Sequence, residues 1–286
     1  MSNVALLPKL DLLGQTIVVT GSSSGIGAAT AVHVAARGAR VVLHGRADSD
    51  RIQQVARLIR DIQDPLDPQI EDIEFLFGDF SETQSWNDDR WDEWVAPIWN
   101  RCVRIDHWIN NAGADVLTGN WKDESFTEKL NYVWHVDVAA TMMLSRVVGE
   151  RMQNQPTPES ESEKRVPGIV NIGWDQADQG MAGESGIMFA ATKGAVMAMS
   201  KSLAQHFAPT VRVNCVAPGW IRTKWGEATS EYWNQRAAGE SLLNRWGTPE
   251  DVAAMIGFLC SGDAQFVNGQ VLNVNGGFRF DQTSTK

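Results

Sequence analysis

Two stretches of the sequence hold residue types whose spacing could support chemistry, and the first is the glycine-rich run TGSSSGIG at residues 20–27. Gly21 can take a tight turn, Gly25 lets the backbone approach a pyrophosphate, and Gly27 permits a helix to pack closely on a sheet. The N–H groups at the start of the next helix would then face the phosphates. Glycine-rich loops also serve as plain turns, but between a strand and a helix this run predicts dinucleotide binding.

The second stretch is GIMFAATKGAVMAMSKSLA at residues 186–204, which is typical of a helix. Phe189 and Lys193 lie one turn apart in it and therefore share a face. The lysine is a cation that could stabilise negative charge on a reacting oxygen, as is needed when a hydride is added to a carbonyl. The phenylalanine has no proton to give, so its position cannot supply a general acid.

Arg46 bears on the kind of dinucleotide. Binding of NAD usually uses an acidic residue at the end of the second strand, which accepts a hydrogen bond from the ribose 2′-hydroxyl. The segment VVLHGRADSD at 41–50 has Gly45 at that place, followed by Arg46. An arginine can bind a 2′-phosphate through two parallel hydrogen bonds, so the sequence favours NADP(H) over NAD(H). The alternative is a solvated arginine, with Asp48 only capping the next helix.

Apolar runs that are typical of buried strands alternate with helical segments along the chain. Strands are expected at 15–21, 39–45, 73–80, 106–113, 168–174, 211–220 and 269–277. Helices are expected at 25–38, 50–62, 133–152, from 186 onward and at 249–262. This alternation predicts right-handed crossovers between parallel strands, and hence an α/β fold with a doubly wound parallel sheet and helices on both faces.

Two polar inserts interrupt the alternation, near residues 62–73 and 153–168. Their proline, glutamate and serine content is typical of surface loops that need not pack. No linker divides the chain, so residues 1–286 are predicted to form a single domain that ends in a tail at 279–286.

The motifs TGSSSGIG, GDF at 78–80, NNAG at 110–113, the lysine of the 186–204 helix and PGWIRT at 218–223 follow one another along the chain. In these motifs and their order the sequence resembles the short-chain dehydrogenase/reductase family over nearly its whole length. The resemblance implies a Rossmann-type domain that binds NAD(H) or NADP(H) at the carboxyl ends of its strands. It also implies oxidoreductase activity on a small-molecule substrate.

The resemblance implies cofactor contacts at the positions that match the family's motifs. Asp79 and Phe80 match an adenine-contacting pair. Asn110, Ala112 and Gly113 match a segment beside the adenosine ribose, which in the family also supports the sheet. The other implied positions are Gly21, Ser23, Ser24, Gly25, Ile26 and Gly27 at the phosphates, Lys193 at the ribose, and Pro218, Gly219, Ile221 and Thr223 at the nicotinamide.

Four further positions carry the family's chemistry. A serine and a tyrosine hold the carbonyl oxygen, a lysine lowers the tyrosine pKa and binds ribose, and an asparagine supports a water chain to that lysine. Here Lys193 is kept, but Phe189 replaces the tyrosine, Trp174 replaces the serine and Asp137 replaces the asparagine. Loss of both a general acid and an oxyanion donor removes roughly 5–9 kcal/mol of transition-state stabilisation, which leaves little ordinary carbonyl reduction.

Two carboxyl groups are candidates to replace the missing hydroxyls. Asp175 follows Trp174, and a partly buried carboxyl there could stay protonated and donate a proton. Asp137 could pair with Lys193 and hold it as a cation that stabilises charge electrostatically. The alternatives are that Asp175 caps a loop and that Asp137 only neutralises Lys193.

The substrate side is expected to be rich in aromatic side chains, since the family resemblance places several of the 12 tryptophans on loops that border it. An aromatic box for a flat ring or a cation could be formed by Trp174, Phe189, Trp220, Trp225, Tyr232 and Trp233. Burial in the core is the alternative for these residues. A separate group is spaced like one helix face, and packing or a subunit contact explains it better: Trp86, Trp91, Trp94 and Trp99.

Composition excludes several other classes of function. The net charge of −10, without a run of lysine or arginine, argues against nucleic acid or an anionic membrane as a partner. Three widely spaced cysteines suit a reducing cytoplasm and are expected to be buried, and five histidines without metal-binding spacing predict no metal site. The N-terminal residues have the pattern of neither a signal peptide nor a membrane span.

The sequence therefore leaves two hypotheses for the function. The first is an NADP(H)-dependent oxidoreductase with an altered proton route, acting on a flat or aromatic carbonyl, imine or conjugated substrate. The second is a dinucleotide-binding sensor or partner subunit without redox turnover. The helices near 131–152 and 189–207 resemble those that pair subunits in the family, which implies a homodimer or homotetramer.

Overall fold

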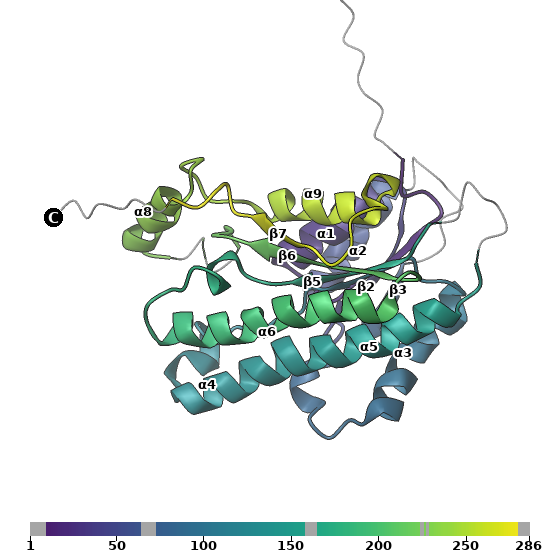
Figure 1. Ribbon diagram of the computed structural model, residues 1–286, viewed down its shortest axis with the longest axis horizontal. Coiled ribbons are helices and arrows are strands. Elements are labelled where there is room, and N and C mark those ends of the chain that lie inside the picture. Colours follow the sequence, from purple (N-terminus) through teal and green to yellow (C-terminus); the bar gives the residue numbers. More distant parts are fainter. Residues whose placement is uncertain (1–9, 64–72, 158–164, 224–225, 227–228, 280–286) are drawn as a thin grey trace, which may run out of the picture.

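Seven parallel strands form one sheet in the order β3-β2-β1-β4-β5-β6-β7 (Figure 1). The computed structural model describes residues 10–63, 73–157, 165–223, 226 and 229–279. The strands are β1 (Thr16–Val19), β2 (Arg40–Gly45), β3 (Glu74–Phe77), β4 (His107–Asn110), β5 (Gly168–Ile172), β6 (Arg212–Pro218) and β7 (Val271–Val274). The strand order reverses between β1 and β4, so the loops after these strands diverge and leave a crevice at their carboxyl ends. The predicted doubly wound sheet is confirmed.

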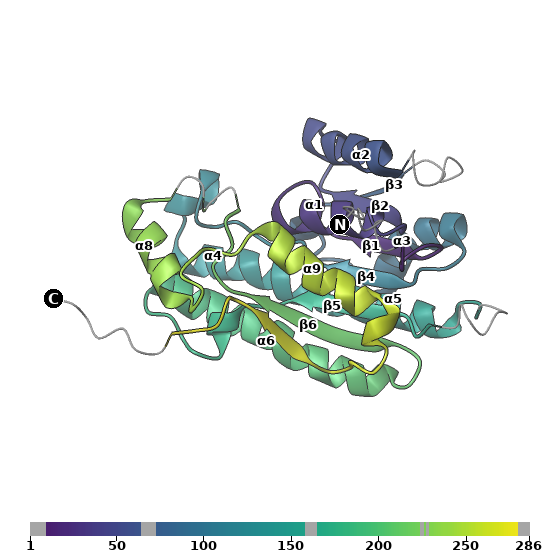
Figure 2. The same cartoon turned by 90° about the horizontal axis from the view of Figure 1, so that it is seen from above.

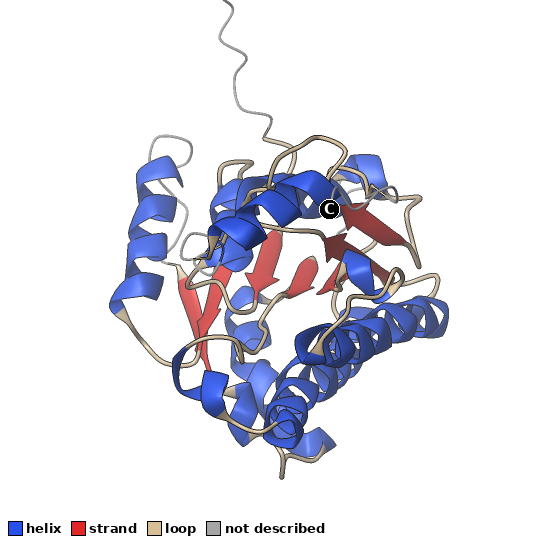
Figure 3. Cartoon of the chain, turned by 90° about the vertical axis from the view of Figure 1, so that its left-hand side faces the viewer, coloured by secondary structure: helices blue, strands red, loops and turns tan. Residues whose placement is uncertain are grey.

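Helices cover both faces of the sheet (Figures 1 and 2). One layer contains α1 (Gly25–Ala35), α2 (Asp50–Gln63) and α9 (Pro249–Cys260), and the other contains α3 (Asp88–Cys102), α5 (Ala140–Asn154) and α6 (Glu184–Phe207). Two more helices, α4 (Phe126–Val133) and α8 (Glu231–Glu240), lie at the end of the molecule that Figure 3 faces. Short 3-10 turns occur at Phe80–Glu82, Gly119–Asp123, Asp175–Ala177 and Gly262–Ala264.

The alternation of side chains along each strand divides the core into two layers. Ile17 and Val19 of β1 pack with α1, α2 and α9, whereas Val18 between them packs with α3 and α5. All four residues of β1 are buried, as expected for a parallel strand that is covered on both faces.

Tryptophans of α3 contribute to the second layer. Trp91 and Trp99 are buried, and the ring of Trp99 stacks on that of Trp108 in β4 with centroids 6.2 Å apart. Trp86 and Trp94 are partly buried against the same cluster. Packing rather than substrate binding therefore accounts for these four residues, as predicted. The three cysteines are buried and carry free thiols.

The long helix expected at 133–152 is confirmed, but the helical run begins earlier, with α4. Between α4 and α5, residues Trp134–Ala139 form a π-helical segment that the sequence did not predict. The π segment holds Asp137, and such wide turns occur preferentially at functional sites. Helix α8 was not predicted, and most of both polar inserts and of the C-terminal tail lies outside the described residues. None of the described helices is long and apolar enough to cross a bilayer.

Candidate active site

The glycine-rich turn between β1 and α1 has no room for a side chain at Gly21 or at Gly27. Gly21 and Gly25 have positive φ angles of +64° and +55°, which favour glycine. A Cβ at Gly21 would lie 2.8 Å from the Cα of Ala112, and one at Gly27 would overlap the Gly21 carbonyl. The turn is therefore packed directly against the segment that follows β4.

The start of α1 is open to an anion. Ser24 is the N-cap residue, but its side chain makes no capping hydrogen bond to the first turn. A Cβ added to Gly25 would meet only Thr223, whose Cγ2 would be 3.6 Å away. Thr223 belongs to the loop after β6, so two segments assigned to the cofactor face each other here. The free N–H groups and the lack of a side chain at Gly25 fit a pyrophosphate.

His44 of β2 holds the glycine-rich turn in place through hydrogen bonds. The Gly21 N–H donates to His44 Nδ1 at 3.0 Å, and His44 Nε2 lies 3.1 Å from the Gly78 carbonyl oxygen after β3. Since Nδ1 accepts, the proton of the neutral ring sits on Nε2 and is donated to Gly78. Burial lowers the pKa of His44 to about 4, which keeps the ring neutral. The sequence analysis did not single out this residue.

The adenosine end of the cleft differs in part from the prediction. Arg46 is exposed directly after β2. Asp79 Oδ1 accepts from the N–H and the hydroxyl of Ser81 at 2.9 and 2.7 Å. Phe80 is wrong as a side-chain contact for adenine, because its ring is 4% exposed and stacks on His44 with centroids 4.7 Å apart. Burial of a large apolar ring determines its direction.

Asn110 is also wrong as a side-chain contact for the cofactor. It is buried, and its amide donates to Ser145 Oγ at 3.0 Å and to Asn171 Oδ1 at 2.8 Å. The next residue, Asn111, instead donates to the Thr20 carbonyl at 2.9 Å and so holds the glycine-rich turn. The NNAG motif located this segment in the sequence. Only the pleat of β4 decides which of its asparagines faces the turn.

The loop 218–223 is fastened at several points. Gly219 N–H donates to Val274 O at 3.0 Å, and a Cβ there would lie 2.6 Å from the Cβ of Asn275. Ile221 forms a parallel bridge with Gly247. Backbone bonds from Arg222 and to Trp220 extend this bridge, so the loop is a rigid wall of the cleft.

Asp137 and Lys193 form a buried ion pair at the reactive end. Lys193 Nζ lies 2.8 Å from Asp137 Oδ2, and the two side chains are 16% and 2% exposed. Asp137 Oδ1 accepts from the Ala114 N–H at 2.7 Å, and Lys193 donates to the Ile172 carbonyl at 3.3 Å. The carboxylate thus connects the segment after β4 to α6. The direct pairing predicted from sequence is confirmed.

A cavity of about 570 Å³ adjoins this ion pair. The described residues that line this cavity are Leu117, Gly173, Trp174, Met181, Ala182, Gly183, Glu184, Ser185, Phe189, Lys193, Trp220 and Trp233. Trp174 and Phe189 meet edge to face with centroids 6.3 Å apart, where serine and tyrosine hydroxyls would be in the family. Tyr132 stacks on Trp121, and Tyr232 is 64% exposed, so neither tyrosine lines the described cavity.

The expected aromatic box is present in part. Trp174, Phe189, Trp220 and Trp233 line the cavity, whereas Tyr232 contacts Trp233 from outside. Trp225 lies outside the described residues. The sequence analysis missed Trp246, whose ring meets Trp220 edge to face at 5.9 Å.

The aromatic wall of the cavity consists of Trp174, Phe189, Trp220 and Trp233, and Glu240 holds it to neighbouring segments. Its carboxylate accepts from Trp220 Nε1 at 2.6 Å, from Arg236 Nε at 2.7 Å and from Gln176 Nε2 at 3.2 Å. The guanidinium of Arg236 lies 5.1 Å from the centroid of the Trp233 ring. One carboxylate of α8 therefore joins the loops after β5 and β6.

Asp175 is wrong as a residue of the cavity wall. Its Oδ2 accepts from Asn275 Nδ2 at 3.0 Å and lies on the side of Gly219, so it joins the loops after β5 and β7. Burial raises the pKa of this carboxyl to about 6, although the bond from Asn275 acts in the opposite direction. With a pKa of about 6 the carboxyl takes up a proton more readily than an ordinary aspartate, but its bond to Asn275 and its place beside Gly219 make it a positioning residue for the loops after β5, β6 and β7.

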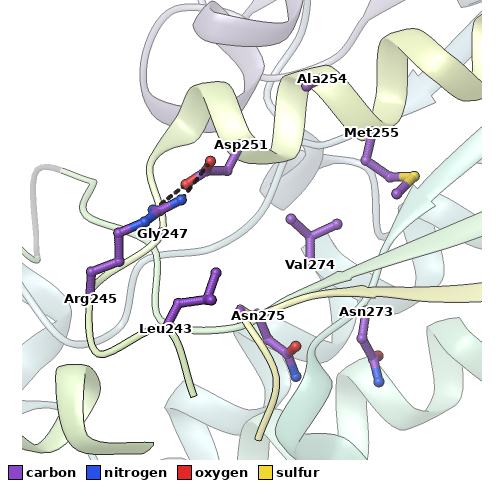
Figure 4. Close-up of a pocket in the computed structure, with 10 residues that line it drawn as sticks. Leu243, Arg245, Gly247, Asp251, Ala254, Met255, Asn273, Val274 and Asn275 are labelled. Carbon is purple, nitrogen blue, oxygen red and sulfur yellow. Dashed lines mark hydrogen bonds and ion pairs between the residues drawn. The ribbon is translucent and has the colours of Figure 1, made fainter. Parts of the chain in front are cut away.

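A second cavity, of about 380 Å³, lies beside α9 and β7 (Figure 4). Arg245 forms a bidentate ion pair with Asp251 at its edge, with distances of 2.6 and 3.0 Å. The same Asp251 carboxylate accepts from the Thr248 N–H at 2.8 Å and caps α9. The charges of Arg245 and Asp251 in this cavity therefore balance each other.

Comparisons with known proteins agree with this architecture. A family model described as enoyl-(acyl carrier protein) reductase matches residues 21–279. The 3-oxoacyl-acyl-carrier-protein reductase FabG of Aquifex aeolicus is 30% identical over 271 residues, which cover 94% of this chain and 99% of that protein. Dehydrogenase/reductase SDR family member 4 of Mus musculus is 30% identical over 283 residues, with coverage of 97% and 91%.

A solved structure shows the same fold. It is a protein of Beutenbergia cavernae, provisionally assigned as an NAD(P)-dependent gluconate 5-dehydrogenase, with NADP bound at low occupancy. It is 30% identical to this chain, with a TM-score of 0.75, and the match covers 94% of this chain and 98% of that one.

Replacing Asp137 by alanine should lower the free energy of unfolding by about 3 kcal/mol or more, because it leaves the Lys193 ammonium buried without its counter-charge. The measurement is guanidinium denaturation of Asp137→Ala, Lys193→Ala and the double variant. The double variant should lose clearly less than the sum of the single losses. Strict additivity would show that the ion pair is not coupled in the folded protein.

Stability should depend on the protonation of His44. Its pKa is about 6.5 in the unfolded chain and about 4 in the folded protein, so the unfolded state takes up the proton first as pH falls. The contribution of His44 is fully present above pH 6.5 and decreases by about 3 kcal/mol on acidification to pH 4. His44→Gln should therefore lose less stability between pH 7 and pH 5 than the natural protein, as measured by denaturant unfolding. His107 titrates in both proteins and cancels, and equal losses would contradict the assignment.

Proposed function

The chain belongs to the short-chain dehydrogenase/reductase family, and we propose that it is an NADP(H)-dependent oxidoreductase with an altered proton route. Its substrate is a flat or aromatic carbonyl, imine or conjugated molecule, and hydride is transferred to or from it. The observation that carries this proposal is the retention of Lys193 beside an open aromatic cavity from which the hydroxyls of the family are missing.

The residues of the cleft fit a dinucleotide. Backbone N–H groups at the start of α1 would hold the pyrophosphate, and the wall 218–223 would face the nicotinamide. The Lys193 ammonium has three donor hydrogens, of which Asp137 and the Ile172 carbonyl take two. The third is left for a ribose hydroxyl. When bound, the dinucleotide supplies the hydride chemistry, and the protein supplies orientation and charge.

Preference for NADP(H) is supported by the end of β2. Arg46 is exposed there, and Gly45 places no carboxylate beside it that would repel a phosphate. The relative from Beutenbergia cavernae, whose structure contains NADP, is consistent with this preference.

The proposal of an altered proton route is supported by the residues that line the cavity. Neither Phe189 nor Trp174 can give up a proton to a substrate oxygen, because a phenyl ring has no acidic proton and an indole N–H can only donate a hydrogen bond, and the Asp175 carboxyl does not line the described cavity. Among the described residues that line the cavity, Lys193 is the one cation that could stabilise a developing negative charge, and Asp137 holds it in place. Substrates that need little help at a leaving or receiving oxygen are therefore favoured.

A non-catalytic dinucleotide-binding sensor or partner subunit is the second candidate. The absence of both hydroxyls favours it, since turnover of ordinary ketones would be slow. The open, aromatic cavity at the reactive end favours the enzyme. Either protein would work as a homodimer or homotetramer, which the exposed Trp134 and Met142 on the helical segment 134–154 support. The free thiols of the cysteines suit a reducing cytoplasm.

Arg46→Ala should weaken NADPH binding about 10-fold or more and leave NADH binding nearly unchanged, because only the 2′-phosphate gains a charged hydrogen bond from the guanidinium. Titration of tryptophan fluorescence with each nucleotide measures both affinities. The exposed Arg57 of α2 offers a matched control, since Arg57→Ala removes the same charge outside the cleft. Equal losses for the two nucleotides would contradict the preference for NADP(H).

Restoring the two hydroxyls should restore carbonyl reduction. The double variant Phe189→Tyr with Trp174→Ser supplies a general acid and an oxyanion donor, and NADPH oxidation with small ketones should rise at least about 10²-fold. The single variants should gain much less, because the two groups act on the same oxygen. No gain, with nucleotide binding intact, would show that more than the proton path has been changed.

A further inference from the structure

The reactive end of the cavity carries no uncompensated positive charge. Lys193 is the one lysine or arginine among the described residues that line it, and Asp137 neutralises it at 2.8 Å. An asparagine at position 137 would leave this lysine as a net cation. The aspartate therefore makes the site electrostatically acceptable to a positively charged substrate.

One carboxylate of the wall has no counter-charge in the described part of the chain. Glu184 lines the cavity from the first turn of α6 and forms no ion pair with the described residues. A ligand beside Glu184 and Lys193 would thus meet one carboxylate and one ammonium that is already paired. This balance attracts cations and disfavours anions.

The aromatic wall has the same preference. The faces of tryptophan and phenylalanine rings attract cations through their quadrupoles. Trp220 and Trp233 already have the Arg236 guanidinium 5.9 and 5.1 Å from their centroids, with its charge countered by Glu240. Trp174 and Phe189, whose rings meet edge to face, line the same cavity. These four rings and the Glu184 carboxylate together form a site that suits a flat cation.

A cationic substrate also explains the missing hydroxyls. When hydride adds to a carbonyl, an alkoxide develops that must be stabilised and protonated. When hydride adds to an iminium carbon, the existing positive charge is cancelled and a neutral amine results. No proton has to be supplied and no oxyanion forms, so the reaction needs neither the tyrosine nor the serine of the family.

We propose that the substrate is a flat iminium ion, held between the rings of Trp174, Phe189, Trp220 and Trp233 with Glu184 as its counter-charge. The inference rests on the proposed function and names the substrate class for the same site. The reaction forms a C–H bond at the iminium carbon, and the C=N π electron pair becomes the lone pair of the amine nitrogen. The substrate is reduced by two electrons, and the dihydronicotinamide is oxidised.

Binding can be tested without turnover by calorimetric titration of the protein saturated with 1,4,5,6-tetrahydro-NADP, whose ring is neutral like that of NADPH but transfers no hydride. The probes are N-methyl-3,4-dihydroisoquinolinium and 1-tetralone, a neutral bicyclic ketone of similar size. The cation should bind at least about 10-fold more tightly than the ketone. Glu184→Gln should reduce cation binding about 5-fold and leave ketone binding unchanged. Asp137→Asn should also weaken cation binding, because Lys193 regains its net charge.

Glu231→Gln is the matched control, because Glu231 is an acidic residue in the first turn of α8 that does not line the cavity. It should leave both affinities unchanged. With NADPH in place of the tetrahydro analogue, the iminium should be reduced and the ketone should not, as followed by loss of NADPH absorbance. Equal binding of both probes, or an unchanged cation affinity in Glu184→Gln, would overturn the inference while the oxidoreductase proposal stands. Failure of NADPH to bind would overturn the proposed function itself.

Discussion

The ion pair between Asp137 and Lys193 is the interaction on which the organisation of the reactive end depends. It is almost completely buried, and it joins the π-helical segment 134–139, α6 and the backbone after β4. A buried charge must be paired, so the direction of each side chain is fixed by the other. The pair also determines what Lys193 can do, because the carboxylate takes one of the ammonium hydrogens and cancels the positive charge of Lys193 beside the cavity.

The two ends of the cleft have diverged to different extents. At the phosphate end, the glycine-rich turn keeps the close backbone packing that a pyrophosphate requires, and His44 fixes Gly21 from within the sheet. At the reactive end, rings occupy the places of two hydroxyls. The phosphate end therefore keeps the packing that suits a nucleotide, whereas the reactive end has rings at the two positions where the family has hydroxyls.

The cavity wall is built by contacts between loops. Glu240 joins Trp220, Arg236 and Gln176, and Asp175 joins Asn275 to the region of Gly219. Glu240 therefore holds the loops after β5 and β6 to α8, and Asp175 holds the loop after β5 to the segment after β7. Since these bonds are largely shielded from water, they keep the aromatic rings in place and so define a shape for a flat ligand.

The sequence by itself determined the alternation of strands and helices and the glycine-rich turn, because periodicity and turn chemistry are local properties. Its resemblance to the family also marked the changes at positions 137, 174 and 189, and it led to the pairing of Asp137 with Lys193 because the matching family residues act together. The tertiary structure alone decided that Asn111 rather than Asn110 faces the glycine-rich turn, that Phe80 enters the core and that Asp175 bonds to Asn275 rather than lining the cavity. These outcomes depend on the pleat of a strand and on burial against distant residues, which no local pattern encodes.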